Sequence, residues 1–491
     1  MNAIILGIAV LIPFLTGALI AVLPFKNRQQ MMIYIESCVL VNSILVIWTV
    51  LHAPQESLVM FKMAADLSLS FRLDGLGTVF AVMVSLLWPL ATLYSFEYMK
   101  HEEHEKIFYM FYTMTFGVTL GIAYSANLPT MYCFYELLTL VTVPLVMHTL
   151  SREAILASRT YLYYSLGGAA FAFIGMVFIL SYGRTSEFIP GGVLDITRLG
   201  GKENLMQIVY LMCFCGFSVK AAMFPFSGWL PKAGVAPTPV TALLHAVAVV
   251  KAGAFTIMRV TYYSFGAQYL RGTWGQYAVM ALTVFTIVYG CSRALKETHL
   301  KRRLAWSTVS NLSYILFGVS LMTPAGLTAA MSHMLFHAVI KICAFFCAGA
   351  VIYKTGKNYV HELNGFGRKM PKVFIVFTIS GCALMGVPGL CGFISKWYLV
   401  QAAIDTGTPL AYIGVAALLA SALLTAIYMM SVTVRAFFPG RDFDYETISN
   451  VNDPNWMMIL PLCLFVVIML ILGIHSTPLI EALSTISVLM R

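Results

Sequence analysis

Residues 326–352 read GLTAAMSHMLFHAVIKICAFFCAGAVI, an apolar run that contains two histidines and a lysine. The run exceeds the roughly 20 residues that a helix needs to cross a hydrocarbon core about 30 Å thick. Because backbone polar groups in lipid must be satisfied within their own segment, we expect a transmembrane helix here. The stretch therefore predicts a membrane protein that carries titratable side chains at lipid depth.

The composition agrees with that interpretation. The 491 residues are 59% hydrophobic and 11% charged, with a mean hydropathy of +0.83, whereas soluble domains are roughly 45–50% apolar and about 25% charged. We predict an all-α integral membrane fold of about 14 transmembrane helices. The expected spans are 3–24, 31–52, 77–95, 107–124, 128–148, 160–182, 206–224, 238–260, 276–294, 304–322, 326–352, 373–404, 409–434 and 457–476.

The net charge of +10 reflects membrane topology rather than a nucleic-acid surface. Of the 31 Lys and Arg residues, 19 fall in or at the edges of the loops after odd-numbered spans, 8 lie on the opposite side, and four lie well inside spans. Cytoplasmic loops of membrane proteins are enriched in these residues. The bias predicts that the odd-numbered loops are cytoplasmic and that both termini are outside.

Motifs for cofactors and metals are not found in the sequence. The ten cysteines lie in or at the ends of apolar spans and form no CxxC pair, so we interpret them as small core residues rather than zinc or iron–sulfur ligands. The sequence has no GxGxxG after a strand and no GxxxxGK[ST], which excludes the common dinucleotide and ATP motifs. We expect no cofactor in this chain.

The four basic residues inside spans are Lys220, Lys251, Lys341 and Lys396. A lysine near a helix centre costs about 2.5–3.5 kcal/mol on insertion scales, so each needs a partner, water or a function. The alternative is a side chain that reaches the headgroups from a span end. That alternative has most weight for Lys396, which follows a break rich in Gly and Pro.

Acidic and imidazole groups accompany these lysines. Glu136 is predicted to be the only acid at comparable depth, and it has no basic residue nearby on its own helix, so its partner must come from another helix or its carboxyl must be neutral. His333, His337 and Lys341 follow at i, i+4 and i+8, which places them on one stripe rising roughly 12 Å. Such a stripe favours proton exchange over three separate core residues.

His245 adds a further candidate, with a geometric condition. It lies six residues before Lys251, hence about 9 Å and 120° away on a regular helix. The two residues can face one hydrated interior only if that interior is wide or the helix bends.

Two spans are interrupted. Pro225 follows Lys220 in KAAMFPFSGWLP (residues 220–231), and GVPGLCG (residues 386–392) precedes Lys396. Discontinuous helices expose backbone groups near the midplane of transporters, although an ordinary proline kink is the simpler alternative. Residues 216–220 and 392–396 are similar in sequence. A second alignment of the two interrupted spans conflicts with this match, so an internal repeat has only weak support.

At this point the sequence resembles the antiporter-like membrane subunits shared by complex I (NADH:quinone oxidoreductase), Mrp cation/proton antiporters and membrane-bound hydrogenases. The order and spacing of several motifs carry the resemblance, which covers spans 5 to 12. The matching stretches are Tyr135-Glu136-Leu137, the segment from Phe217 to Phe255 with Trp229-Leu230-Pro231, Pro237-Thr238-Pro239 and Val250-Lys251-Ala252-Gly253, residues 301–311, His333 to Lys341, and Gly386 to Lys396.

The resemblance implies an architecture: N-terminal helices in residues 1–106, two inverted five-helix repeats in 107–260 and 276–434, each with a broken helix, and a C-terminal helix in 457–491. It also implies roles. Glu136 is similar to the family's glutamate that pairs with the lysine matched by Lys220, Lys251 matches the central lysine, and Lys396 matches the terminal exchange residue. The family has lysine or glutamate at that last position.

We therefore hypothesise that this chain is the ion-translocating subunit of a redox-driven pump in a prokaryotic plasma membrane. Burial disfavours the Lys220 ammonium and a nearby carboxylate favours it, so movement of Glu136 would switch the lysine between holding and releasing a proton. The expected relay comprises Glu136, Lys220, His245, Lys251, His333, His337, Lys341 and Lys396.

Partners and rivals complete these expectations. The resemblance implies homologous antiporter-like subunits, other membrane subunits and peripheral electron-transfer subunits that carry iron–sulfur clusters, with nickel–iron or flavin centres depending on the host complex. Redox catalysis is not expected in this chain. The rival functions are an Mrp-type Na⁺(K⁺)/H⁺ antiporter subunit, which would bind both ions by turns, and an inert scaffold, which would tolerate leucine at the buried lysines.

Overall fold

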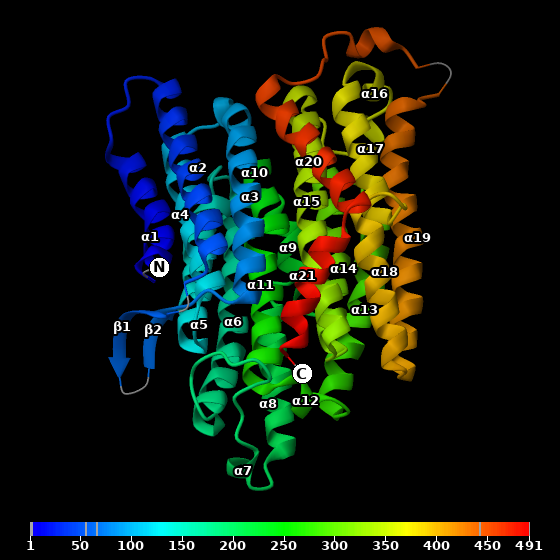
Figure 1. Cartoon of the computed structure of the whole chain (residues 1–491). Helices are drawn as coiled ribbons and strands as arrows, with labels where there is room; N and C mark the ends of the chain where they lie inside the picture. The colour runs from blue at the N-terminus through cyan, green and yellow to red at the C-terminus, as the bar shows by residue number, and fades with distance from the viewer. Residues whose placement is uncertain (1–2, 55, 65–66, 441–442, 491) are drawn as a thin grey trace.

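The computed structural model describes residues 3–54, 56–64, 67–440 and 443–490, and in this part of the chain the fold is a bundle of long helices (Figure 1). Eleven helical stretches are long and apolar enough to cross a membrane. They are α1 (Ile4–Val22), α2 (Arg28–His52), α3 (Gly75–Tyr98), α4 (Glu105–Tyr124), α5 (Leu128–Val146), α6 (Arg152–Tyr182), the composite stretch Thr238–Phe265, α13 (Trp274–Lys296), α15 (Pro324–Thr355), α19 (Pro409–Phe437) and α20 (Trp456–Ile474).

The predicted membrane fold is thus confirmed, whereas the count of 14 spans is not. Three of the predicted spans are not among these eleven helical stretches, and local features of each explain why. α8 (Glu203–Ser218) is short because its span is broken after it, α14 (Leu300–Ser320) begins with three basic residues, and the span 373–404 is split into α17 (Pro371–Met385) and α18 (Cys391–Thr406). The remaining helices are α21 (Thr477–Val488), α7 (Ile196–Leu199), α9 (Trp229–Ala233), α12 (Ala267–Leu270) and α16 (Phe366–Lys369).

Capping residues set the ends of several long helices. Asn27, Asp74 and Asn127 accept hydrogen bonds from backbone N–H groups in the first turns of α2, α3 and α5. Thr323 does the same for α15, and Pro324 at the first helical position supplies a suitable φ angle. The helix containing the opening run therefore starts at Pro324 and extends to Thr355, slightly beyond both predicted ends.

A small sheet interrupts the helical pattern between α2 and α3. Strand β1 (Leu58–Ala64) pairs antiparallel with β2 (Leu67–Phe71), with Leu58 opposite Phe71. The sequence analysis predicted no strand here. The loops after α1, α3 and α19 lie at the upper end of the bundle in Figure 1, opposite this hairpin and α7. Arg441 and Arg491, which entered the charge count, lie outside the described residues.

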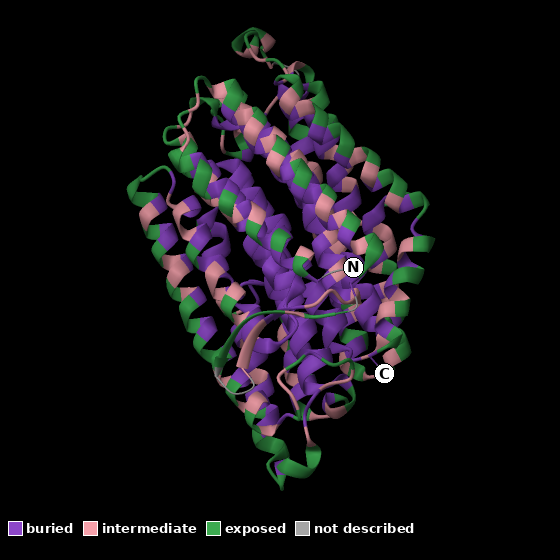
Figure 2. Cartoon of the chain, turned by 60° about the vertical axis from the view of Figure 1, so that its left-hand side comes forward, coloured by how far each residue is buried: buried purple, intermediate pink, exposed green. Residues whose placement is uncertain are grey.

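Burial divides the helices into outer and central groups. Figure 2 shows buried residues concentrated along the interior of the bundle and exposed ones on its outer faces. We compared the share of buried residues in the most apolar 18 residues of each helical stretch. This share is 100% in Thr238–Phe265 and 89% in α15, but only 33% in α2, α19 and α20. The predicted titratable stripe therefore lies on a central helix that protein surrounds.

Candidate functional site

Both predicted helix breaks are present, and each has a lysine within it or next to it. α8 ends at Ser218, Ala222 adopts a positive φ of 53°, and the chain resumes as α9 at Trp229. α17 ends at Met385, Gly386 adopts a φ of 97°, and α18 starts at Cys391. A positive φ is tolerated by glycine but is uncommon for alanine, so the first break is held by its surroundings.

Lys220 lies within the first break and contacts α5. Its side chain is fully buried, and its Nζ is 3.9 Å from Oε1 of Glu136. The ammonium also donates a hydrogen bond to the carbonyl oxygen of Tyr135 and lies 3.3 Å from the centre of that residue's ring. The partner of Glu136 thus comes from another helix, one of the two possibilities left open by its sequence.

The first break is fixed by close packing. A Cβ added at Gly253 on α11 (Val249–Arg259) would lie 2.6 Å from the backbone nitrogen of Ala221. The carbonyl oxygen of Val219 accepts hydrogen bonds from the Trp229 ring N–H at 2.8 Å and from the backbone N–H of Ala222 at 3.0 Å. The lysine at the break is therefore positioned by α5, α9 and α11 together.

The composite helix bends between His245 and Lys251. Leu243–Val247 forms a π-helical turn, and Ala248 follows with a ψ of −79°. A π-bulge changes the angular relation of residues on either side, so the sequence condition of a bent helix is met. Both ring nitrogens of His245 are buried and have no hydrogen-bond partner among the described residues, and the ring lies 4.8 Å from that of Phe345.

Lys251 on α11 meets the predicted stripe on α15. Its Nζ is 2.5 Å from Nδ1 of His337, and both side chains are fully buried. The ring of His337 lies 5.7 Å from that of His333, whose Nδ1 is 2.9 Å from the hydroxyl of Ser395 on α18. Because Ser395 directly precedes Lys396, these contacts connect the centre of the bundle to the second break.

The two ends of the stripe lead in different directions. Lys341 donates hydrogen bonds to the carbonyl oxygen of Leu304, at 3.0 Å, and to the hydroxyl of Ser307, both on α14. It therefore lies beyond His337 on the side opposite to His333, and not between His333 and Lys396. Lys341 and Lys251 remain within electrostatic range of each other.

Lys396 is half-buried on α18 and binds the broken end of α17. Its Nζ donates to the carbonyl oxygens of Leu384 and Met385 at 2.6 and 3.0 Å. It also lies 5.4 Å from the ring centre of Tyr314. The other three lysines are fully buried, so the alternative of a side chain reaching the headgroups does not apply to them.

Some charged residues that the bundle buries were not expected to be buried from the sequence. Lys301 was counted with a cytoplasmic cluster, but it is 6% exposed and donates to the carbonyl oxygen of Ala236 at 2.9 Å. Arg259 was counted as an outer basic residue, yet it is fully buried and forms an ion pair with Asp74. Glu36, inside the predicted span 31–52, has one buried carboxyl oxygen without a hydrogen-bond partner.

The only available sequence signal for these residues was their neighbourhood. Lys301 stands beside Arg302 and Arg303, which resembles a loop cluster, and Glu36 lies five residues from the predicted start of its span. Sequence position gives no depth for a residue at a helix end, because the bundle around that end decides it.

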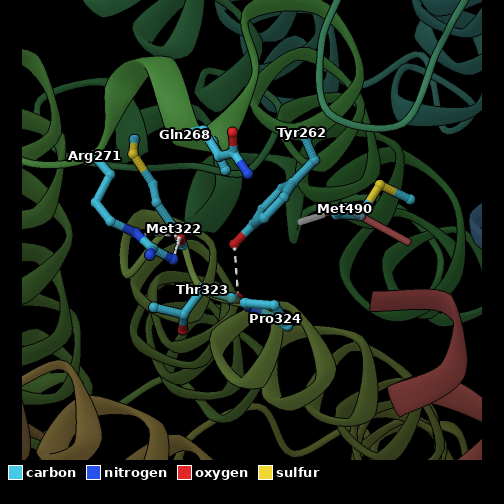
Figure 3. A pocket seen from close by; sticks show the side chains of 8 residues that line it. Tyr262, Gln268, Arg271, Met322, Thr323, Pro324 and Met490 are labelled. Atoms are coloured by element: carbon cyan, nitrogen blue, oxygen red, sulfur yellow. Dashed lines mark hydrogen bonds between the residues drawn. The ribbon is translucent and has the colours of Figure 1, made fainter. Parts of the chain in front are cut away.

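A cavity of about 450 Å³ lies away from the lysines, between the end of the composite helix, the start of α15 and the C-terminal residues (Figure 3). Tyr262 donates from its hydroxyl to the carbonyl oxygen of Thr323 at 3.2 Å, and Arg271 donates to that of Met322 at 2.6 Å. The predicted relay residues do not line it. Among the described residues no cluster of three His, Cys, Asp or Glu side chains is arranged to hold a metal ion.

Comparisons with known proteins show the family of this chain. The family model described as "NADH:quinone oxidoreductase/Mrp antiporter, TM" matches residues 125–438, and that of the N-terminus of complex I chain 5 matches residues 61–109. The putative antiporter subunit mnhA2 of Staphylococcus aureus strain MSSA476 is 28% identical over 437 residues, covering 82% of this chain and 52% of the relative. The chain thus spans about half the length of the curated relatives it matches.

Solved structures show the same fold at low sequence identity. A chain of the Mrp complex from Dietzia sp. DQ12-45-1b aligns with a TM-score of 0.84 at 21% identity, covering 99% of this chain and 97% of that one. A chain of an archaeal membrane-bound sulfane sulfur reductase gives the same values. A chain of complex I from Thermus thermophilus gives 0.80 at 20% identity, covering 99% and 100%.

The family model covers well over half of the sequence, and the matched region contains every lysine, histidine and glutamate of the predicted relay. The resemblance found in the sequence motifs is therefore confirmed. This chain belongs to the antiporter-like membrane subunits of the NADH:quinone oxidoreductase and Mrp antiporter family.

Proposed function

We propose that this chain moves protons across the membrane as a subunit of a multisubunit pump, by transfer among buried Glu, Lys and His side chains and intervening water. The observation that carries the proposal is the contact between Lys251 and His337. A lysine and a histidine at hydrogen-bond distance, both removed from water, hold at most one excess proton between them, because two adjacent unscreened cations repel strongly. Such a pair can accept a proton on one side and release it on the other.

The pair at Lys220 supplies the switch in this scheme. An isolated ammonium is costly away from water, and a carboxylate close to it favours the charged form. Glu136 is partly exposed at the outer face of α5, with 23% of its side chain accessible. Movement of Glu136 relative to Lys220 would therefore release or retain a proton, and a neighbouring subunit at that face could drive the movement.

The contacts suggest an order for the relay. A proton released at Lys220 would reach Lys251 through water near His245, pass to His337 and His333, and continue by Ser395 to Lys396. Lys341 branches from this line toward α14, where it would adjust the charge near Lys251. In this proposal the odd-numbered loops are cytoplasmic, both termini are outside, and the membrane is a prokaryotic plasma membrane.

The energy would come from partner subunits. We propose homologous antiporter-like subunits beside this chain in the membrane, with peripheral subunits that carry iron–sulfur clusters and, depending on the host, nickel–iron or flavin centres. The membrane-bound reductase and complex I structures share this fold. An Mrp-type Na⁺(K⁺)/H⁺ exchange is the second candidate, which the similarity to the mnhA2 antiporter subunits favours.

The test uses the assembled complex in proteoliposomes. Lys220→Ala or Glu136→Ala should abolish coupled proton transport, while Lys232→Ala, an exposed lysine on α9, should leave it unchanged. Full proton transport in the two relay variants would rule out the mechanism. Radioactive sodium uptake measured beside proton flux separates the two candidates, because only the exchanger moves sodium in proportion to protons.

A further inference from the structure

A second group of buried polar side chains lies in the N-terminal helices, outside the relay. Eight of the described residues on α2, α3 and α4 have a buried polar atom with no hydrogen-bond partner. Six of these residues are at most 1% exposed: Asn42, Ser85, Trp88, Tyr112, Thr113 and Tyr124, the last at the far end of α4. A buried polar group without a partner destabilises the folded protein, and ordered water is the usual way in which proteins supply the missing partner.

The group has a carboxyl at its edge. One oxygen of Glu36 on α2 is buried without a partner, and the carboxyl lies within electrostatic range of the Tyr112 hydroxyl on α4. The Tyr112 ring in turn lies 5.4 Å from that of Trp88 on α3. Glu36, Tyr112 and Trp88 thus lie near one another on three helices, and α1 contributes no charged residue there.

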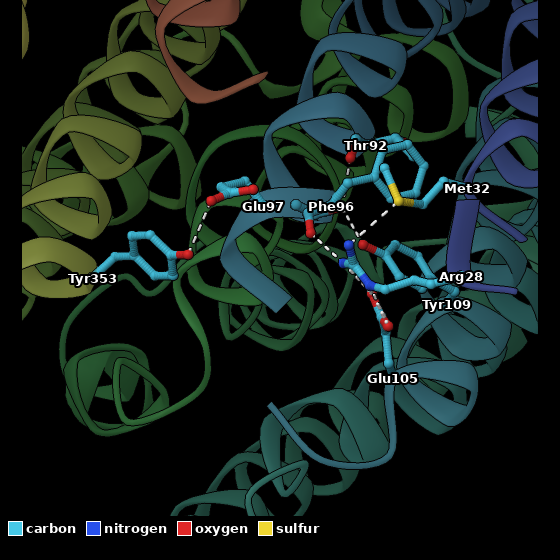
Figure 4. Close-up of polar contacts among 9 residues, drawn as sticks. Arg28, Met32, Thr92, Phe96, Glu97, Glu105, Tyr109 and Tyr353 are labelled. Carbon is cyan, nitrogen blue, oxygen red and sulfur yellow. Dashed lines mark hydrogen bonds and ion pairs between the residues drawn. The ribbon is translucent and has the colours of Figure 1, made fainter. Parts of the chain in front are cut away.

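Polar contacts lead from this place to the upper end of the bundle. The hydroxyl of Tyr109, one turn before Tyr112, is 3.1 Å from that of Ser95, which donates to the carbonyl oxygen of Thr92 at 2.7 Å. Beyond them, Arg28 forms an ion pair with Glu105 at 2.5 Å and donates to the carbonyl oxygen of Phe96 (Figure 4).

The upper end of this series opens to the surface. Arg28 and Glu105 line a cavity of about 520 Å³. Another acid at this end, Glu97 of α3, accepts a hydrogen bond from the Tyr353 hydroxyl at 3.0 Å (Figure 4). The polar series thus begins at a solvent-facing ion pair and ends about two helical turns deeper, at Glu36.

We propose that α2, α3 and α4 enclose a water-filled tract that leads from the Arg28–Glu105 pair to Glu36, and that the Glu36 carboxyl binds a proton delivered through it. A hydronium ion at the mouth gives its proton to the water chain, and the Glu36 carboxylate becomes a neutral carboxylic acid. No charged group faces this carboxyl from α1, and the charged residues of α3 and α4 are Glu97, Glu105 and Lys106, all at the upper ends of their helices. The tract is separate from the relay and does not depend on its function.

Hydroxyl-radical footprinting of the assembled complex tests for the water. Radicals produced from bound water oxidise the side chains beside it, so Trp88 and Tyr112 should be modified although both are fully buried. Tyr94 is a matched control on α3, because it is equally buried but its hydroxyl donates to the carbonyl oxygen of Phe346 at 2.8 Å. Modification several-fold above that of Tyr94 is expected, and modification equal to it would overturn the tract.

Reaction with dicyclohexylcarbodiimide tests for the proton. The reagent adds to a protonated carboxylic acid and rearranges to an N-acylurea without a leaving group, so mass spectrometry should find the adduct on the peptide that contains Glu36. Labelling should rise as the pH falls, and Glu36→Gln should remove the adduct while adducts elsewhere persist. An unlabelled Glu36 across the pH range would overturn the proton site, and the wild-type result stands even if the variant fails to assemble.

Discussion

The lysine at each helix break needs polar partners, and the two breaks provide different ones. At the first, Lys220 lies 3.9 Å from the carboxylate of Glu136. At the second, Lys396 donates to the carbonyl oxygens of Leu384 and Met385 within the broken helix itself. A carboxylate on another helix can move away from its lysine, whereas the carbonyls at the end of α17 are fixed by the backbone. The comparison suggests that the first break controls the release of the proton and that the second is the end of the proton path.

The largest expected difference comes from reversing the charge at each lysine. Lys220→Glu places a second carboxylate beside Glu136, and two acids sharing a site cannot both ionise, so proton transport should fall to background. Lys396→Glu keeps a group that holds a proton and can donate to one carbonyl, so the rate should fall only about tenfold, or roughly 1.4 kcal/mol for a charge-assisted bond replaced by a neutral one.

Proton flux in proteoliposomes measures both variants. Lys232→Glu, on the exposed surface of α9, controls for the added negative charge. Equal losses of proton flux in Lys220→Glu and Lys396→Glu would contradict the different roles proposed for the two breaks.

The link between the breaks should behave as one unit. Lys251→Met and His337→Phe each remove one partner of the central contact and should slow transport by about tenfold to a hundredfold, the effect of losing a buried hydrogen bond to a charged group. In the double variant the loss should not exceed that of the more severe single change. Rates that multiply in the double variant would mean that the two side chains act on separate paths.

Packing at the breaks provides a smaller effect that can be measured without transport. Gly392→Ala would place a methyl group on the carbonyl oxygen of Ala383, at the second break, and Gly253→Ala would place one 2.6 Å from the nitrogen of Ala221, at the first. Both should destabilise the protein by about 1–3 kcal/mol, Gly392→Ala more.

Thermal unfolding in detergent gives the comparison. Gly167→Ala is the matched control on α6, because nothing lies within 4 Å of the added carbon. If all three variants melt together, the close packing inferred at the breaks is incorrect.

The smallest expected effect is a change of folding stability with pH that arises at His299. It must be subtracted when the pH dependence of the two breaks is compared. His299, just before α14, is partly buried beside Lys301 and Arg302, which lowers its pKa to about 4, burial being the larger cause. The unfolded chain binds a proton at this site near pH 6.5, so folding stability should decline as the pH falls from about 6.5 to about 4. His299→Gln should flatten thermal stability across that window, and an unchanged slope would contradict the assignment.

Sequence patterns predicted the parts of this fold that depend on local chemistry. Apolar runs located most of the helices, and Pro225 and the Gly386–Gly392 segment marked both breaks. The spacing of His333, His337 and Lys341 predicted one stripe, which forms on α15. These features follow from residues close together in the chain, so the sequence contains them.

Features set by packing between distant segments could not be predicted from the sequence. The contact of Lys251 with His337 joins residues on two helices, and nothing local selects His337 over Lys341 as the partner. The burial of Lys301 and Glu36 depends on neighbouring helices, as does the strand pairing between Leu58 and Phe71. Depth and partnership are properties of the assembled bundle, and the motifs alone do not specify them.

The most direct test of the account is a high-resolution density map of the assembled complex with its water molecules. The account predicts ordered water between Lys220 and Lys251, and a continuous polar connection from there through His337 and His333 to Lys396. A map in which closely packed apolar side chains fill the space between Lys220 and Lys251, with no water between them, would contradict it.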